Sequence, residues 1–213
     1  MKLSQKGLEL IKLYSNMVKK GYKNKDHSIV KDAFSDFESR AYRDQLKKDL
    51  KFFKIKTILD YGCGGSDWDA KDFDPNGQSA KEFYNLDACY RYEPSRGIDE
   101  RRKVDCVINF DVLEHIFIAD ISKVIDNIFS FASTLVIINV ACYPATALLP
   151  NGENAHITVR HPLWWKSQVD SIALNYPDIN VLLLTSTGWR KTSAFPIYKA
   201  RDWLNSDAFV INE

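Results

Sequence analysis

Residues 57–66, Thr-Ile-Leu-Asp-Tyr-Gly-Cys-Gly-Gly-Ser, constrain the fold of this chain more than any other stretch. The segment begins with apolar, β-forming residues, reaches an acid at Asp60 and passes directly into glycines. This order predicts a buried strand that turns sharply at its carboxyl end. Gly62 and Gly64 lack a Cβ, so the backbone there can adopt positive φ and approach a small molecule closely. Because ligands of open α/β sheets bind beyond the carboxyl ends of strands, we expect a ligand site at this turn.

The residue types in the turn narrow the class of ligand. A phosphate-binding loop of the Walker type would carry a lysine, and a dinucleotide fold would show a G-x-G-x-x-G array; residues 57–66 have neither. The pattern is D-x-G-x-G, and a second acid, Glu93, follows at the end of the next predicted strand. Two acids beside a glycine turn favour a cationic nucleoside over a phosphate.

Three motifs, in order between residues 56 and 140, resemble the class I S-adenosylmethionine-dependent methyltransferases. The first is the glycine turn, in which Ser66 occupies the family's usual third glycine position. The second is Arg-Tyr-Glu-Pro at 91–94, similar to the strand end where the family places an acid that binds the ribose hydroxyls. The third, residues 105–116, resembles the fourth-strand motif of small-molecule members, with its strand, Asp and Leu-Glu-His.

This resemblance implies that S-adenosyl-L-methionine is the cofactor. The residues it assigns to cofactor binding are Asp60, Gly62, Cys63, Gly64, Glu93, Asn109, Phe110 and Asp111. It also implies an α/β, Rossmann-like, doubly wound and mostly parallel sheet whose last strand is antiparallel. The connection 95–103 is too short for a full helix and strand, so we expect the region of the third strand to be abbreviated.

The chain of 213 residues, 45% of them hydrophobic, is long enough for one sizeable core. We expect a single domain, with residues 1–54 as an N-terminal helical extension or lid on a methyltransferase-like domain of residues 55–213. Helical spacing predicts one helix that ends near residue 21 and a second from about residue 30 to 50, and a further helix at 121–132. Strands are expected at 86–92, 134–140, 178–185 and 207–212, the last two as a hairpin-like pair at the sheet edge.

Aromatic residues of the N-terminal extension have two interpretations. Tyr14, Tyr22 and Phe37 either line the pocket, as such extensions do in the family, or pack in the core. The polar loop at 67–77 also has two interpretations. It either binds a divalent ion or is a solvated loop without a metal. Its spacing lacks the sixth-position glycine and twelfth-position glutamate of an EF-hand, so the solvated loop is favoured and no metal is assigned.

The segment 141–165 is the second informative stretch. It resembles a segment of phage and bacterial methyltransferases of unassigned substrate, with the pattern Leu-Pro-x-Gly-x-Asn-Ala-His followed by a pair of tryptophans. Its histidines, His156 and His161, together with His115 are expected near the mouth of the site. Trp164 and Trp165 provide either a stacking platform or core packing.

Methyl transfer from a sulfonium is an in-line displacement that needs alignment and, for a hydroxyl or amine acceptor, a base. Imidazole titrates near neutrality. His156 is the first candidate for this base and His115 the second, with Glu114 as a possible partner. Alternatively, His115 caps a helix and His156 holds its loop by hydrogen bonds. A metal site formed by these three residues is conceivable, although nothing in their spacing demands it.

Three hypotheses for function remain open. The first is a methyltransferase with a small-molecule or nucleotide-like acceptor; the second keeps the fold and makes nucleic acid the acceptor; the third is a non-catalytic cofactor-binding or interaction protein. A net charge of +1 gives no strong attraction to nucleic acid, and the lysine and arginine clusters are flanked by acids. No apolar run is long enough for a membrane span and no signal-type block follows the N-terminus, so we expect a cytoplasmic protein without a membrane partner.

Overall fold

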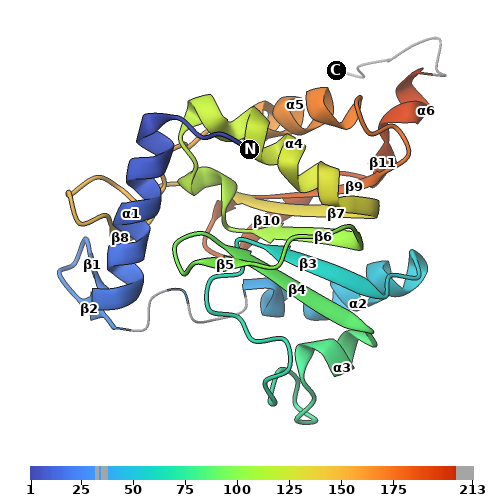
Figure 1. Cartoon of the computed structure of the whole chain (residues 1–213), viewed down its shortest axis with the longest axis horizontal. Helices are drawn as coiled ribbons and strands as arrows, with labels where there is room; N and C mark the ends of the chain where they lie inside the picture. Colours follow the sequence, from blue (N-terminus) through green and yellow to red (C-terminus); the bar gives the residue numbers. More distant parts are fainter. Residues whose placement is uncertain (32–33, 35–37, 205–213) are drawn as a thin grey trace.

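The structure is a computed structural model that describes residues 1–31, 34 and 38–204. Its centre is a mixed, mostly parallel sheet with the strand order β10-β9-β7-β6-β3-β4-β5 (Figure 1). The five parallel strands are β3 (Thr57–Tyr61), β4 (Ala88–Glu93), β6 (Val104–Phe110), β7 (Ala132–Ala141) and β9 (Asn180–Gly188). This α/β architecture is compatible with a Rossmann-like fold, and the strands expected near residues 57, 86, 105, 134 and 178 are all present.

Helices cover both faces of the sheet, which explains why its central strands are continuously apolar. On one face α4 (Ile121–Phe131) and α5 (Pro162–Ala173) pack on a core that includes Val136 and Trp165. On the other face α2 (Arg43–Phe52) and α3 (Ala80–Tyr84) enclose a second core. The helix expected at 121–132 is therefore confirmed as α4.

The chain reverses at both edges of the sheet. After β4, the two-residue strand β5 (Ile98–Asp99) pairs antiparallel with it, so the abbreviation expected at 95–103 is present. Arg101 in this region forms an ion pair with Asp99 at 2.7 Å and lies over the ring of Tyr92. This arginine is thus engaged within the fold.

The opposite edge differs from the expectation. The antiparallel partner of β9 is β10 (Lys191–Ala194), followed by β11 (Tyr198–Lys199), which also pairs with β9, and by α6 (Ala200–Leu204). Residues 207–212, expected to form the last strand, lie outside the described residues. The hairpin at this edge is formed earlier in the chain, because the tight turn at 189–190 lets β10 fold back on β9.

The N-terminal region begins as predicted. α1 (Gln5–Lys20) is capped by the side chain of Ser4 and ends before Gly21, whose φ is +76° and whose added Cβ would lie 2.4 Å from the Val30 carbonyl oxygen. The second helix, expected from about residue 30 to 50, is present only in its later part, as α2. Residues 29–30 instead form β2 (Ile29–Val30), which pairs with β1 (Tyr22–Asn24); a 3-10 turn, η1 (Glu38–Tyr42), then leads into α2. β1 also pairs with the distant β8 (Ala147–Leu148), a contact that local periodicity cannot reveal.

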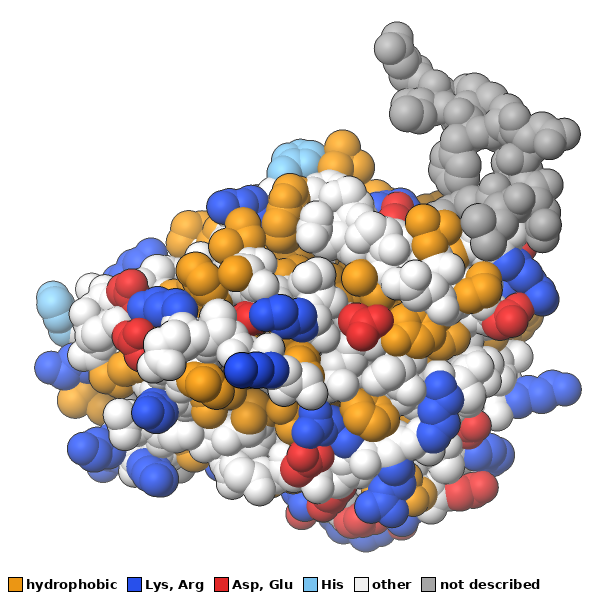
Figure 2. All heavy atoms as spheres, turned by 45° about the horizontal axis from the view of Figure 1, so that its top comes forward, with side chains coloured by type: hydrophobic (Ala, Val, Ile, Leu, Met, Phe, Trp, Pro, Cys, Tyr) orange, Lys and Arg blue, Asp and Glu red, His pale blue; other side chains and the backbone are white. Residues whose placement is uncertain are grey.

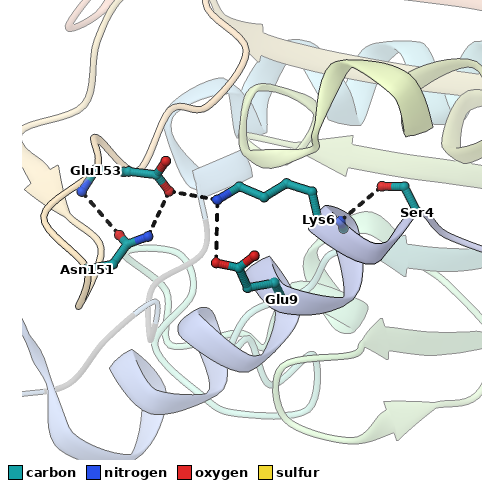
Figure 3. A network of polar contacts seen from close by, with 6 residues as sticks. Ser4, Lys6, Glu9, Asn151 and Glu153 are labelled. Atoms are coloured by element: carbon teal, nitrogen blue, oxygen red, sulfur yellow. Dashed lines mark hydrogen bonds and ion pairs between the residues drawn. The ribbon is translucent and has the colours of Figure 1, made fainter.

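α1 and the small sheet β2-β1-β8 lie beside one end of the main sheet (Figure 1). Leu10 and Met17 of α1 pack against Ala147, Leu149 and Ala155 of the segment after β7. The ion pair of Lys6 with Glu153 at 3.0 Å links the same two segments at the surface, and Lys6 also pairs with Glu9 of its own helix at 3.5 Å (Figure 3). The apolar contacts dominate this docking, since exposed ion pairs contribute little to stability.

The polar loop at 67–77 contains a short network of its own. The carboxylate of Asp74 accepts hydrogen bonds from the backbone N–H groups of Asn76 and Gln78. Among residues 1–31, 34 and 38–204, the carboxylates of this loop belong to no group of three potential metal ligands.

None of the described helices combines the length and apolarity that crossing a bilayer requires.

Candidate functional site

A cavity of about 570 Å³ lies where the carboxyl ends of β3, β4 and β6 meet α1 and the segment after β7. β4 and β6 lie on opposite sides of β3, so the chain changes direction across the sheet at this point, which is where open α/β folds bind ligands. The predicted site residues that line the cavity are Asp60, Gly62, Cys63, Gly64, Glu93, Phe110, Asp111, His115 and His156. Tyr14 and Tyr22 of the N-terminal region line it too, whereas Phe37 lies outside the described residues.

The glycine turn requires its glycines. Gly62 has a φ of +88°, and an added Cβ would lie 2.3 Å from Cγ2 of Val112. The backbone N–H groups of Gly62 and Cys63 both donate to the carbonyl oxygen of Tyr92, at 2.7 and 3.2 Å. The turn is therefore held against the end of β4 and has no room for a side chain on its β6 side.

Asp60 is buried and closes the loop that follows the turn. Its Oδ2 accepts hydrogen bonds from the hydroxyl of Ser66 at 2.8 Å and from the indole Nε1 of Trp68 at 3.0 Å. Burial raises the pKa of Asp60 to about 6. The contribution of Trp68 was missed in the sequence, although an isolated tryptophan in a polar loop is itself a signal of burial.

Glu93 is held between two backbone segments. Its Oε2 accepts a hydrogen bond from the N–H of Gly64 at 3.2 Å, and its Oε1 accepts from the N–H and hydroxyl of Ser95 at 2.9 and 2.7 Å. These bonds orient a carboxylate at the cavity wall directly beside the glycine turn.

The end of β6 separates two residues that were assigned the same role. Asp111 has a φ of +52° and lines the cavity. Asn109 does not line it: the side chain is fully buried, and its Nδ2 donates to the carbonyl oxygen of Tyr61 at 2.7 Å. Asn109 was assigned to the cofactor, but its side chain bridges β6 to β3 inside the sheet, whereas Asp111 lies just beyond the end of β6.

The cavity wall opposite the glycine turn carries two histidines. His115 lies in a short 3-10 turn, η2 (Leu113–His115), and its Nδ1 is 2.9 Å from the Ala155 carbonyl oxygen and 3.0 Å from the Tyr14 hydroxyl. His156 has its Nδ1 against the Tyr143 carbonyl oxygen. The two rings meet edge to face with centroids 4.9 Å apart. The N-cap residue of α4, the helix that follows β6, is Asp120, so His115 does not cap that helix.

Both rings are in the neutral form at neutral pH. Burial and the neighbouring His156 lower the pKa of His115 to about 3, and burial also lowers the pKa of His156. Glu114 lies behind them with no exposed surface and is not among the residues that line the cavity. Its Oε1 accepts from the backbone N–H of Ala141 at 3.1 Å, and burial together with the nearby Asp111 carboxylate raises the pKa of Glu114 well above its usual value.

The tryptophan pair is not part of the cavity. Trp165 is fully buried in the core under α5, and neither Trp164 nor Trp165 lines the cavity. A different tryptophan, Trp189 in the turn between β9 and β10, lines it and is 71% exposed. Nothing in the local sequence distinguished Trp189, because the pairing that brings this turn to the cavity is between distant strands.

The carboxylates and the absence of lysine and arginine give the described part of the cavity wall a negative charge. Among the described residues, those that line the cavity include no lysine or arginine, whereas Asp60, Glu93 and Asp111 contribute carboxylates. A fourth carboxylate of the wall, that of Asp120, is paired with Lys123 at 3.2 Å. On the outer surface, lysine and arginine side chains are spread with acidic side chains between many of them (Figure 2). The cavity therefore favours a ligand that carries positive charge.

The chain matches no protein-family model, no curated protein and no solved structure.

Proposed function

We propose that this chain is an S-adenosylmethionine-dependent methyltransferase with a Rossmann-like, class I fold, acting on the oxygen or nitrogen of a small-molecule or nucleotide-like acceptor. The observation that carries the proposal is the wall of the cavity, which combines a glycine turn with carboxylates and has no lysine or arginine among its described residues. A phosphate ligand would lack a partner there, whereas a sulfonium and an ammonium group are both favoured.

The cavity residues fit this cofactor by shape and by donor type. Gly62 and Gly64 leave the backbone bare beside the cavity, where a Cβ would meet neighbouring atoms. Glu93 offers a fixed carboxylate for a pair of ribose hydroxyls, and Asp60 and Asp111 place negative charge near a cationic methionyl group. When bound, the cofactor would supply the electrophilic methyl group.

The remaining part of the cavity would hold the acceptor. Tyr14, Tyr22 and Val112 provide apolar surface there, and His115 and His156 provide polar atoms. The walls align the acceptor and exclude water. In His156, Nδ1 is committed to the Tyr143 carbonyl oxygen, so Nε2 remains to accept a proton from the acceptor.

Calorimetric titration of the purified chain with S-adenosylmethionine and, separately, with S-adenosylhomocysteine tests the proposal. We expect one cofactor per chain with an affinity in the micromolar range, and heat from both ligands. Absence of binding by both would overturn the proposal. A screen of nucleosides, sugars and amines for formation of S-adenosylhomocysteine would then identify the acceptor.

Nucleic acid is the second candidate acceptor, and Trp189 is the observation that favours it. An exposed tryptophan at the rim of a cavity can stack on an unpaired base, and the neighbouring Arg190 lies over its ring. Retention on single-stranded RNA or DNA that weakens with salt would support this acceptor. Equal elution with and without oligonucleotide at low salt would exclude it.

A further inference from the structure

Glu114, His115 and His156 come together although 40 residues of chain separate the two histidine-bearing segments. One carboxylate oxygen and one nitrogen from each ring all lie within 4.8 Å of one another. Ligands of a tetrahedral ion at about 2.1 Å are separated by about 3.4 Å, so side-chain shifts of roughly 1 Å would bring these three atoms to coordination distance and leave the fourth position open.

The hydrogen-bond partners of the two imidazole rings determine which nitrogen of each ring carries the hydrogen. The Tyr14 hydroxyl donates to the Ala155 carbonyl oxygen at 2.6 Å, so Nδ1 of His115, which contacts both of these oxygens, is the donor to them. Nδ1 of His156 faces the Tyr143 carbonyl oxygen, which only accepts, so this nitrogen also carries the hydrogen. In the neutral rings this leaves Nε2 with a free lone pair. A ring nitrogen held by a backbone carbonyl while the other nitrogen is free is the usual arrangement around metal-binding histidines.

Glu114 supplies an independent observation. The side chain has no exposed surface, its Oε1 accepts from Ala141, and its Oε2 has no hydrogen-bond partner among the described residues. No lysine or arginine among the described residues forms an ion pair with Glu114, and the nearby Asp111 carboxylate adds charge of the same sign. A buried carboxylate oxygen without a partner is costly unless a cation or a proton balances it.

We infer that Glu114, His115 and His156 bind one divalent transition-metal ion, such as Zn²⁺, in the wall of the cavity. Two imidazoles and one carboxylate suit Zn²⁺, Fe²⁺ or Co²⁺ better than Mg²⁺ or Ca²⁺, which prefer all-oxygen sites. Because both histidines line the cavity, the open positions of the ion would face it. With the ion bound, Nε2 of His156 is a ligand and no longer a base. The role of the ion, which rests on the proposed function, is then to bind an acceptor hydroxyl and lower the pKa of that hydroxyl.

The test uses the full chain after treatment with a chelator and dialysis. Calorimetric titration with Zn²⁺ and visible absorption with Co²⁺ should each give one ion per chain, and Mg²⁺ should give no heat. Glu114→Gln keeps an acceptor for the Ala141 N–H and removes the charge. We expect Glu114→Gln and His156→Ala each to weaken Zn²⁺ binding at least about 100-fold, the upper end of what loss of an outer-shell partner costs.

His27→Ala and His161→Ala are matched controls, because these histidines do not line the cavity and should leave Zn²⁺ affinity unchanged. Far-ultraviolet circular dichroism of each metal-free variant reports whether it is folded. Absence of stoichiometric Zn²⁺ and Co²⁺ binding by the wild type would overturn the inference, as would equal affinity in folded Glu114→Gln. Titration of the metal-free chain with S-adenosylhomocysteine separates the two proposals, since either site can fail while the other binds.

Discussion

The backbone N–H of Gly64 donates a hydrogen bond to Oε2 of Glu93 at 3.2 Å. This contact joins the turn after β3 to the end of β4 and sets the carboxylate beside the glycine turn. Oε1 is held by Ser95 on the other side, so the side chain has little freedom. Pre-orientation of this kind lowers the entropy cost of binding a ligand.

We expect Glu93→Gln to weaken binding of S-adenosylmethionine about 10- to 100-fold, since a hydrogen bond to a charged group is worth about 1.5–3 kcal/mol. Calorimetric titration measures the change. Glu100→Gln is the matched control, because Glu100 bonds to β4 at the same sheet edge and does not line the cavity. If both variants bind like the wild type, the ribose site lies elsewhere.

Asp60 makes stability depend on pH. Its pKa is about 6 in the folded chain and 3.8 in the reference state, so between these values the folded state holds a proton that the unfolded state has lost. Stability therefore falls as pH rises from about 4 to 6. In Asp60→Asn this fall disappears, so the stability of the variant relative to the wild type rises by on the order of 3 kcal/mol between acid pH and pH 7.

Urea denaturation of wild type and Asp60→Asn at pH 4, 5, 6 and 7 checks this expectation. The amide oxygen of the variant can still accept from Ser66 and Trp68, so the loop is preserved. Asp69→Asn, in the exposed part of the same loop, controls for the loss of one charge. Parallel profiles of wild type and Asp60→Asn would contradict the prediction.

Gly62→Ala tests the packing of the turn against β6. Gly62 and Gly97 both have positive φ, yet an added Cβ meets Val112 at the first and nothing within 4 Å at the second. Overpacking costs about 1–3 kcal/mol, so we expect Gly62→Ala to be destabilised by that much more than Gly97→Ala. Combining Gly62→Ala with Val112→Ala should restore part of the loss in thermal unfolding. Equal effects of the two glycine substitutions would show that backbone strain alone is responsible.

Trp189→Ala distinguishes the acceptor site from the cofactor site. Trp189 is at the rim of the cavity, in the turn of the β9–β10 hairpin, and is far in sequence from the glycine turn. For an acceptor that contains a nucleobase, we expect its KM to rise about tenfold or more, because stacking is worth about 1–3 kcal/mol per nucleobase. The affinity for S-adenosylmethionine should not change. Phe52→Ala is the control, since Phe52 is exposed and does not line the cavity. A parallel loss of cofactor affinity would place Trp189 in the cofactor site.

Local sequence determined the strands and the turn. The apolar runs of β3, β6 and β7, the glycines after β3 and the cap of α1 depend on residues that are neighbours in the chain. For the same reason the sequence correctly grouped Asp60, Gly62, Gly64, Glu93 and Asp111 at one edge, because parallel strands end on the same side of a sheet.

Long-range pairing decided the rest. β1 was not predicted as a strand because its partner β8 lies far along the chain, and Asn109 lies outside the cavity because it bridges β6 to β3. Only the packing of α1 on the segment after β7 brings His156 to His115, and only the hairpin after β9 brings Trp189 to the rim. Periodicity and turn chemistry act over a few residues, whereas these contacts depend on which buried surfaces meet once the sheet has formed.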